Sequence, residues 1–97
     1  MEFEKKQEGD TLTYLLHGRL DMNTSPQFLA EMKLNGVKNL IFDLADVDYI
    51  FSAGLRVFLQ AQKEMNERGG TMKIINTQSQ VKEIFNIVGF GSLMDIS

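Results

Sequence analysis

One serine carries most of the chemistry that the residue types and spacing of this chain could support. Ser52 follows a predicted strand-loop over Val47–Phe51 and opens a predicted helix, in the run Ile-Phe-Ser-Ala-Gly-Leu-Arg of residues 50–56. A serine that opens a helix ordinarily accepts a hydrogen bond from a backbone N–H two or three residues on. The same place tolerates a phosphate, because free N–H groups and the positive end of the helix dipole point at it. Ser52 is therefore either a helix cap alone or an acceptor of a phosphoryl group.

The other residues that could do chemistry favour no catalytic or metal site. A serine nucleophile needs a base, and the only histidine, His17, lies inside a predicted strand, where we interpret it as partly buried. Asp43, Asp46 and Asp48 could imitate a metal site, but no EF-hand or histidine-containing ligand spacing accompanies them. The glycines match neither a dinucleotide fingerprint nor a phosphate-binding loop. We therefore predict that the protein is not an enzyme and holds no metal and no cofactor.

Composition predicts one small globular domain over residues 1–97. A chain of 97 residues with 43% hydrophobic and 24% charged content can bury its own core. The net charge of −3, with ten Lys and Arg scattered among thirteen acids, argues against nucleic acid as a partner. No apolar run approaches the roughly 20 residues that span a bilayer, and the N-terminus lacks the apolar core of a signal peptide. We expect a cytoplasmic protein without a membrane span, monomeric when free.

The hydrophobic pattern predicts strands and helices in the order β-β-α-β-α-β-α-β. Strands are expected at Phe3–Gln7, Leu12–Leu16, Asn39–Leu44, Thr71–Asn76 and Leu93–Ile96. Helices are expected from a cap at Thr24 or Ser25 to near Asn35-Gly36, from Ser52 to Gly69-Gly70, and from Val81 to Gly89. Strands joined by helices require a mostly parallel sheet, and the first hairpin adds an antiparallel edge. The fold class is therefore α/β, with a two-layer arrangement.

The longest predicted helix is amphipathic, and three loops should share one surface. Its apolar face is expected to contain Leu55, Phe58, Leu59, Gln62 and Met65, with Arg56, Gln60, Lys63 and Glu67 opposite. In open α/β sheets, functional residues lie beyond the carboxyl ends of the parallel strands. The expected loops there are residues 21–25, the acidic turn and loop of residues 46–52, and residues 76–79. The first of these loops would bring Asp21, Asn23 and Thr24 to the surface that carries Ser52.

Five segments in this order resemble the STAS domain, the family of bacterial anti-sigma-factor antagonists, over nearly the whole chain. Gly-Arg-Leu-Asp at residues 18–21 resembles the family's Gly-x-Leu-Asp, and residues 39–44 resemble its central strand. Phe-Ser-Ala-Gly-Leu at residues 51–55 is similar to the family's Asp-Ser-Ser/Thr-Gly-Leu, whose first serine is phosphorylated. The glycine pair at 69–70 and the segment from Val81 to Phe90 complete the match.

The resemblance implies a partner-switching function. In the family, the unphosphorylated domain binds an anti-sigma factor that is also a serine kinase, which frees a sigma factor. The kinase then phosphorylates the serine, and a serine phosphatase resets it. By position, the implied acceptor is Ser52, and Asp21 is implied as a partner-facing acid. The set that we expect to bind the partner is Asp21, Asn23, Thr24, Phe51, Ser52 and Arg56.

Three positions depart from the family's serine motif, and two alternative functions stay open. Phe51 stands where sporulation-type members carry aspartate, Ala53 replaces the second hydroxyl residue, and Arg56 replaces a common glycine. One alternative is a STAS scaffold that is not phosphorylated and serves as a subunit of a transport or signalling assembly. The other is a small enzyme or ligand-binding α/β domain, which the absence of a catalytic base disfavours. Phosphate on Ser52 would distinguish the switch from the scaffold.

Overall fold

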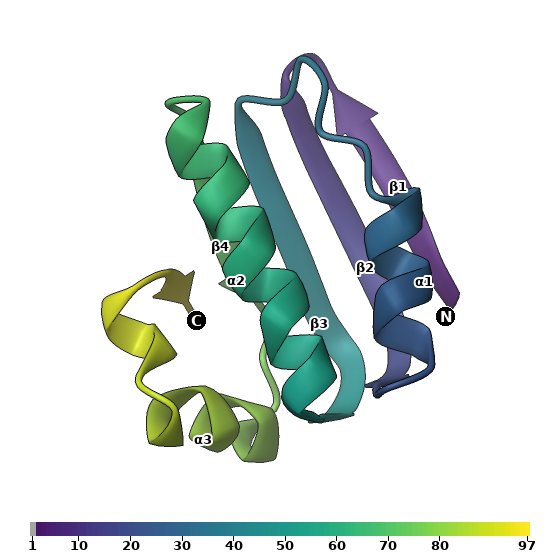
Figure 1. The fold of residues 1–97 in the computed structure, drawn as a ribbon, viewed down its shortest axis with the longest axis vertical. Coiled ribbons are helices and arrows are strands. Elements are labelled where there is room, and N and C mark those ends of the chain that lie inside the picture. Colours follow the sequence, from purple (N-terminus) through teal and green to yellow (C-terminus); the bar gives the residue numbers. More distant parts are fainter. Residues whose placement is uncertain (1) are drawn as a thin grey trace.

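The computed structural model describes residues 2–97 as a mixed sheet with helices (Figure 1). The elements are β1 (Glu2–Glu8), β2 (Thr11–Leu20), α1 (Thr24–Glu31), β3 (Asn39–Ile50), α2 (Ser52–Glu67), β4 (Thr71–Ile75), α3 (Ser79–Ile87), the short 3-10 helix η1 (Phe90–Ser92) and β5 (Asp95–Ile96). The five strands lie in the order β1-β2-β3-β4-β5. The β1–β2 pair is antiparallel and the other three pairs are parallel. The predicted element order and the α/β class are confirmed.

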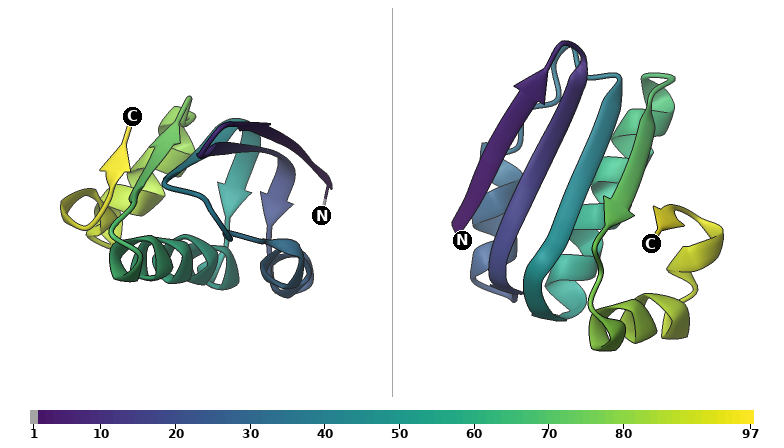
Figure 2. Two further views of the ribbon diagram at one scale, coloured as in Figure 1. Left: turned by 90° about the horizontal axis from the view of Figure 1, so that it is seen from above. Right: turned by 180° about the vertical axis from the view of Figure 1, so that it is seen from behind.

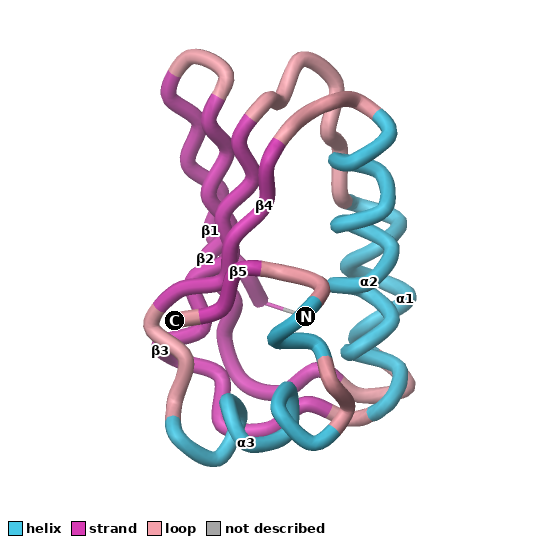
Figure 3. The backbone as a smooth tube through the Cα atoms, turned by 90° about the vertical axis from the view of Figure 1, so that its left-hand side faces the viewer, coloured by secondary structure: helices cyan, strands magenta, loops and turns pink. Residues whose placement is uncertain are grey.

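The sheet and two of its helices form two layers. Helices α1 and α2 lie side by side on one face of the sheet, which Figure 3 shows from the side. Helix α3 lies at the end of the sheet where β3 ends, and no helix of residues 2–97 covers the face opposite α1 and α2 (Figure 2). Among residues 2–97, no helix combines the length and apolar composition that crossing a bilayer requires.

The core fills the space between the sheet and the helices. Alternate residues of the two central strands point inward and are buried, namely Leu12, Tyr14, Leu16, Leu40, Phe42 and Leu44. Phe42 makes edge-to-face ring contacts with Phe28 of α1 and Phe58 of α2, at centroid distances of 6.1 and 5.0 Å. Such contacts stabilise the pairs beyond simple burial, so the aromatic cluster fixes both helices over the central strands.

Strand β3 runs to Ile50, so the acidic turn and loop predicted for residues 46–52 are wrong. Two shifts in the β2–β3 register, between residues 15 and 17 and between residues 18 and 19 of β2, each leave one extra residue on β3. These bulges let two consecutive residues face solvent, first Ala45 with Asp46 and then Asp48 with Tyr49. Aspartates can therefore stand in this strand without burying their charge. Strand β2 likewise continues past Leu16 to Leu20.

Two helix predictions also need correction. Helix α1 ends at Glu31 rather than near Asn35-Gly36, because Met32 already has an extended backbone (ψ 122°). In α2, Leu59 is 45% exposed instead of buried. The buried residues of α2 are Gly54, Val57, Phe58, Ala61 and Met65. Their spacing of three and four residues defines a stripe that Leu59 misses by about a quarter turn, at roughly 100° per residue.

Candidate functional site

Ser52 is the first residue of α2, one position inside the helix. The cap position belongs to Phe51, which is extended (φ −88°, ψ 173°), and no side chain caps the helix. The Phe51 carbonyl accepts hydrogen bonds from the N–H groups of Gly54 (2.9 Å) and Leu55 (3.1 Å). Within residues 2–97 the Ser52 hydroxyl has no hydrogen-bond partner, and the residue is exposed. The prediction that this hydroxyl caps the helix is therefore wrong, because the chain enters α2 one residue earlier than a capping serine requires.

The two loops that enter α1 and α2 form a hollow of about 390 Å³ around Ser52. Its lining consists of Asp21, Met22, Asn23, Phe51, Ser52 and Ala53. The Phe51 N–H donates to the Leu20 carbonyl oxygen (2.9 Å), which ties the end of β3 to the end of β2. Met22 is 79% exposed and Phe51 is 43% exposed. The hollow therefore presents apolar side chains on both sides of a free hydroxyl.

Asp21 shapes this loop from within. Its Oδ1 accepts hydrogen bonds from the N–H groups of Asn23 (2.8 Å) and Thr24 (2.9 Å) and from the Thr24 hydroxyl (3.1 Å). The N–H groups of Thr24 and then Asn23 lower the pKa of Asp21 below its ordinary value. The cap position of α1 is Asn23 rather than the predicted Thr24 or Ser25, and Asp21 binds the N–H groups of the chain that enters the helix. It remains ionised and holds the loop that carries Met22.

The predicted partner-binding residues fall into three neighbouring places. Asp21, Asn23, Phe51 and Ser52 share the hollow described above. Thr24 instead lines a polar hollow beside His17, and the Arg19 carbonyl oxygen lies 3.1 Å from its hydroxyl, where it competes with Asp21 Oδ1 for the one hydroxyl hydrogen. Arg56, exposed one turn beyond Ser52, lines a third depression, with Leu59, Gln60, Lys63, Glu64 and Glu67 along α2. The structure therefore brings four of the six residues together.

Sequence reasoning missed two apolar residues of this surface. Met22 is exposed between two polar loop residues. The Tyr49 ring, 45% exposed, lies 4.6 Å from the Phe51 ring in a tilted contact. Had β3 been extended to Ile50 in the prediction, strand alternation would have put Tyr49 and Phe51 on one side and Ile50 in the core. For Met22, an apolar residue in a loop expected to be polar was the available signal.

Because the Ser52 hydroxyl makes no hydrogen bond among the described residues, we can predict how substitutions at this position affect stability. Ser52→Ala should change the free energy of unfolding by no more than about 0.5 kcal/mol, because no hydrogen bond is lost. Ser52→Asp should stabilise the fold by about 0.3–1 kcal/mol, because a negative charge in the first helical turn interacts favourably with the helix dipole. Thermal melts of the three proteins check both values. A loss of about 2 kcal/mol in the alanine variant would mean that the hydroxyl caps α2 after all.

The chain matches a known family and several curated relatives over most of its length. The family model described as STAS domain matches residues 2–97. BtrV of Bordetella bronchiseptica, a candidate anti-sigma factor antagonist, is 32% identical over 85 residues, covering 84% of this chain and 73% of BtrV. The anti-sigma-B factor antagonist of Staphylococcus epidermidis is 29% identical over 83 residues, covering 82% of this chain and 77% of that protein.

Solved structures show the same fold. The anti-sigma factor antagonist SpoIIAA in its unphosphorylated form matches with a TM-score of 0.78 and 19% identity, covering 99% of this chain and 87% of SpoIIAA. A candidate anti-sigma factor antagonist from Thermotoga maritima matches with a TM-score of 0.89 and 19% identity, covering 97% of this chain and 84% of that one. The sheet order, the helices and the family match agree, and the chain belongs to the STAS domain family.

Proposed function

We propose that this protein is an anti-sigma factor antagonist whose binding to its partner is switched by phosphorylation of Ser52. Without phosphate, it binds an anti-sigma factor that is also a serine kinase, and a sigma factor is released. Phosphorylation of Ser52 ends the binding, and a serine phosphatase restores it. The protein acts in the cytoplasm and is monomeric when free. The relatives named as antagonists support the binding function.

The observation that carries the switch is the free, exposed hydroxyl of Ser52 in the first turn of α2. A phosphate added there contributes about −1.5 to −2 charge and strong acceptor oxygens. The first N–H groups of a helix lack partners within the helix and can donate hydrogen bonds to those oxygens. Because the hydroxyl has no hydrogen bond among the described residues, phosphorylation breaks none. The fold should therefore tolerate the modification, and its effect falls on the surface.

The surroundings of Ser52 favour an apolar contact that a phosphate would disrupt. Met22 and Phe51 line the hollow, and the Tyr49 ring lies against that of Phe51. A partner that packs on these side chains would have to remove water from a phosphate with no cation in the hollow lining to compensate it. The ionised carboxylate of Asp21 in the same lining adds like-charge repulsion.

Phosphate transferred by the cognate kinase is expected on Ser52 alone. The protein would be incubated with candidate anti-sigma factor kinases and ATP, and the modified residue located by mass spectrometry. Ser25 is buried and the Thr24 hydroxyl is already bonded, which makes both poor acceptors. Ser79 is the stringent comparison, because it is also exposed and also begins a helix.

Three results would count against the switch. Phosphate on Ser79, or undiminished incorporation into Ser52→Ala, would assign the acceptor elsewhere. Stable binding to an anti-sigma factor kinase without any phosphate transfer would favour the scaffold that is not phosphorylated.

A further inference from the structure

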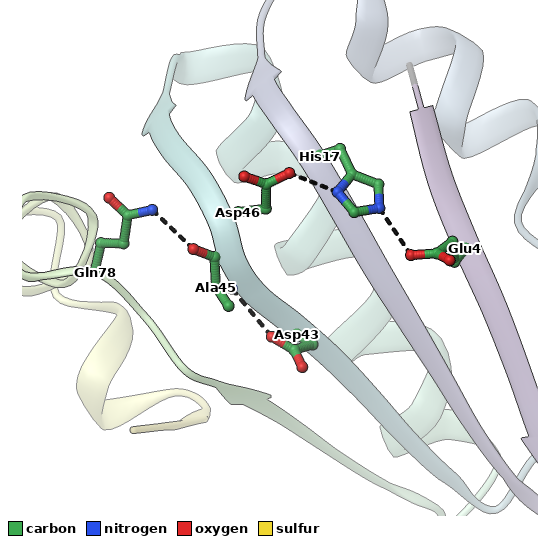
Figure 4. Close-up of polar contacts among 6 residues, drawn as sticks. All are labelled: Glu4, His17, Asp43, Ala45, Asp46 and Gln78. Atoms are coloured by element: carbon green, nitrogen blue, oxygen red, sulfur yellow. Dashed lines mark hydrogen bonds and ion pairs between the residues drawn. The ribbon is translucent and has the colours of Figure 1, made fainter.

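The sheet face opposite α1 and α2 carries a polar cluster that the Ser52 site does not use. His17 of β2 stands between two carboxylates from different strands (Figure 4). Its Nδ1 lies 2.6 Å from Oδ2 of Asp46 in β3, and its Nε2 lies 3.0 Å from Oε2 of Glu4 in β1. One imidazole ring therefore joins three adjacent strands.

Both contacts of His17 can be hydrogen bonds in only one protonation state of the imidazole ring. An ionised carboxylate only accepts hydrogen bonds, whereas a neutral imidazole has a single N–H. With a neutral ring, one unprotonated nitrogen would face a carboxylate oxygen. With the imidazolium, both nitrogens donate. The hydrogen bonds to Asp46 and then to Glu4 raise the pKa of His17 above its ordinary value.

The charges around His17 also favour the proton. Glu2 of β1 is the register partner of His17, and it lines a hollow with Asp46 and Asp48 of β3. Among the described residues, the cation in that lining is Arg19, and Thr24 and Gln78 are neutral. With Glu4 added, four acids and one cation from these three strands either contact the ring or line the hollow that His17 also lines. The local field is therefore negative, which stabilises a positive imidazolium.

The cluster lies where the β2–β3 ladder is interrupted. Asp46 follows the first bulge of β3, where the regular pairing with β2 shifts by one residue. On the far side of the bulge, the Ala45 N–H donates to Asp43 Oδ1 (3.0 Å) and the Gln78 amide donates to the Ala45 carbonyl oxygen (2.9 Å). On the β2 side, the side-chain support depends on the proton of His17.

We propose that His17 is a proton-dependent clamp that fastens β1 and the bulged part of β3 to β2, and that it releases Glu4 when it loses its proton. Asp46 keeps the remaining N–H because its contact is the shorter one. Glu4 then faces a lone pair, and the start of the edge strand β1 keeps its backbone pairing with β2 and the ring contacts of Phe3 with Tyr14 and Phe28. This clamp is independent of the proposed function.

The clamp predicts a specific titration of the one histidine in the chain. In NMR titrations, the imidazole of His17 should show a pKa above the ordinary value of about 6.5. Asp46→Asn and Glu4→Gln should each lower that pKa, with the larger shift for Asp46→Asn. Glu67→Gln, an exposed acid at the end of α2, is the matched control and should leave the pKa unchanged. A wild-type pKa at or below 6.5, or one that neither variant lowers, would overturn the clamp.

The pH dependence of thermal stability tests the clamp independently, because the clamp predicts the direction in which stability changes with pH. The pKa of His17 is raised in the folded state. The contribution of protonated His17 to the free energy of unfolding is therefore fully present below about pH 6.5, and it is lost as the pH rises through the folded-state pKa. Wild type should therefore melt above His17→Gln at about pH 6, and the difference should shrink at about pH 9. A difference of the same size at both pH values would indicate packing alone and contradict the clamp.

Discussion

Ser52→Asp is expected to weaken binding of this protein to its anti-sigma factor at least tenfold, which is about 1.4 kcal/mol, while Ser52→Ala binds like wild type. The charge at residue 52 enters an apolar contact lined by Met22 and Phe51, and its desolvation opposes association. The fold-change is a lower bound, since an aspartate carries less charge than a phosphate. Arg56 lies four residues on along α2 and can pair with an acid at residue 52, which moderates the effect.

A matched control distinguishes the effect of a negative charge at residue 52 on binding from the effect of a change in the protein's net charge. Asn66→Asp adds the same charge to the same helix and keeps the side-chain oxygen that accepts from Gln62. It lies about 21 Å farther along the axis of α2, at roughly 1.5 Å per residue. Titration calorimetry should show wild-type affinity for Asn66→Asp and for Ser52→Ala. If all four proteins, wild type and Ser52→Asp included, bind equally, Ser52 lies outside the interface and the scaffold function is the better explanation.

The fold could be predicted because local pattern and overall topology agree. Alternation in β2 and the apolar run of Asn39–Leu44 specify buried strands, and left-handed glycines follow the ends of α2 and α3. Gly69 and Gly89 have φ of +73° and +78°. The exact course of β3 could not be predicted, because Asp46 and Asp48 favour a turn in any local interpretation. They stand in a strand only because two bulges, formed against β2, turn them outward.

The clustering of four of the candidate site residues could be predicted from the sequence, but their detailed geometry could not. The order of the elements placed Asp21, Asn23, Phe51 and Ser52 at one edge of the sheet, and the structure puts them around one hollow. Whether the Ser52 hydroxyl caps α2 depends on a shift of one residue in the helix start, which sequence patterns do not resolve. His17 was interpreted as a partly buried strand residue. Its bridge to Asp46 depends on pairing between residues 29 apart in sequence.

Gly54→Ala is expected to destabilise the fold by about 2 kcal/mol, which lowers the melting temperature by roughly 8–16 °C in a domain of this size. A Cβ on Gly54 would lie 2.5 Å from Leu20 Cβ, 2.9 Å from Ile50 Cγ2 and 3.0 Å from the Leu20 carbonyl oxygen. Alanine gains about 1 kcal/mol of helix propensity. Overpacking costs about 1–3 kcal/mol, and the upper value applies because Leu20 and Ile50 are buried at the ends of β2 and β3.

The matched control is Gly91→Ala, which should change stability by no more than about 0.5 kcal/mol. A Cβ there would lie 3.7 Å from Asn86 Oδ1, an ordinary contact. Thermal melts of both variants measure the difference. If Gly54→Ala is as stable as wild type, α2 does not approach β2 and β3 as closely as described. If it is destabilised, only a glycine at residue 54 lets the start of α2 lie against both strand ends, which is the contact that holds Ser52 beside the Asp21 loop.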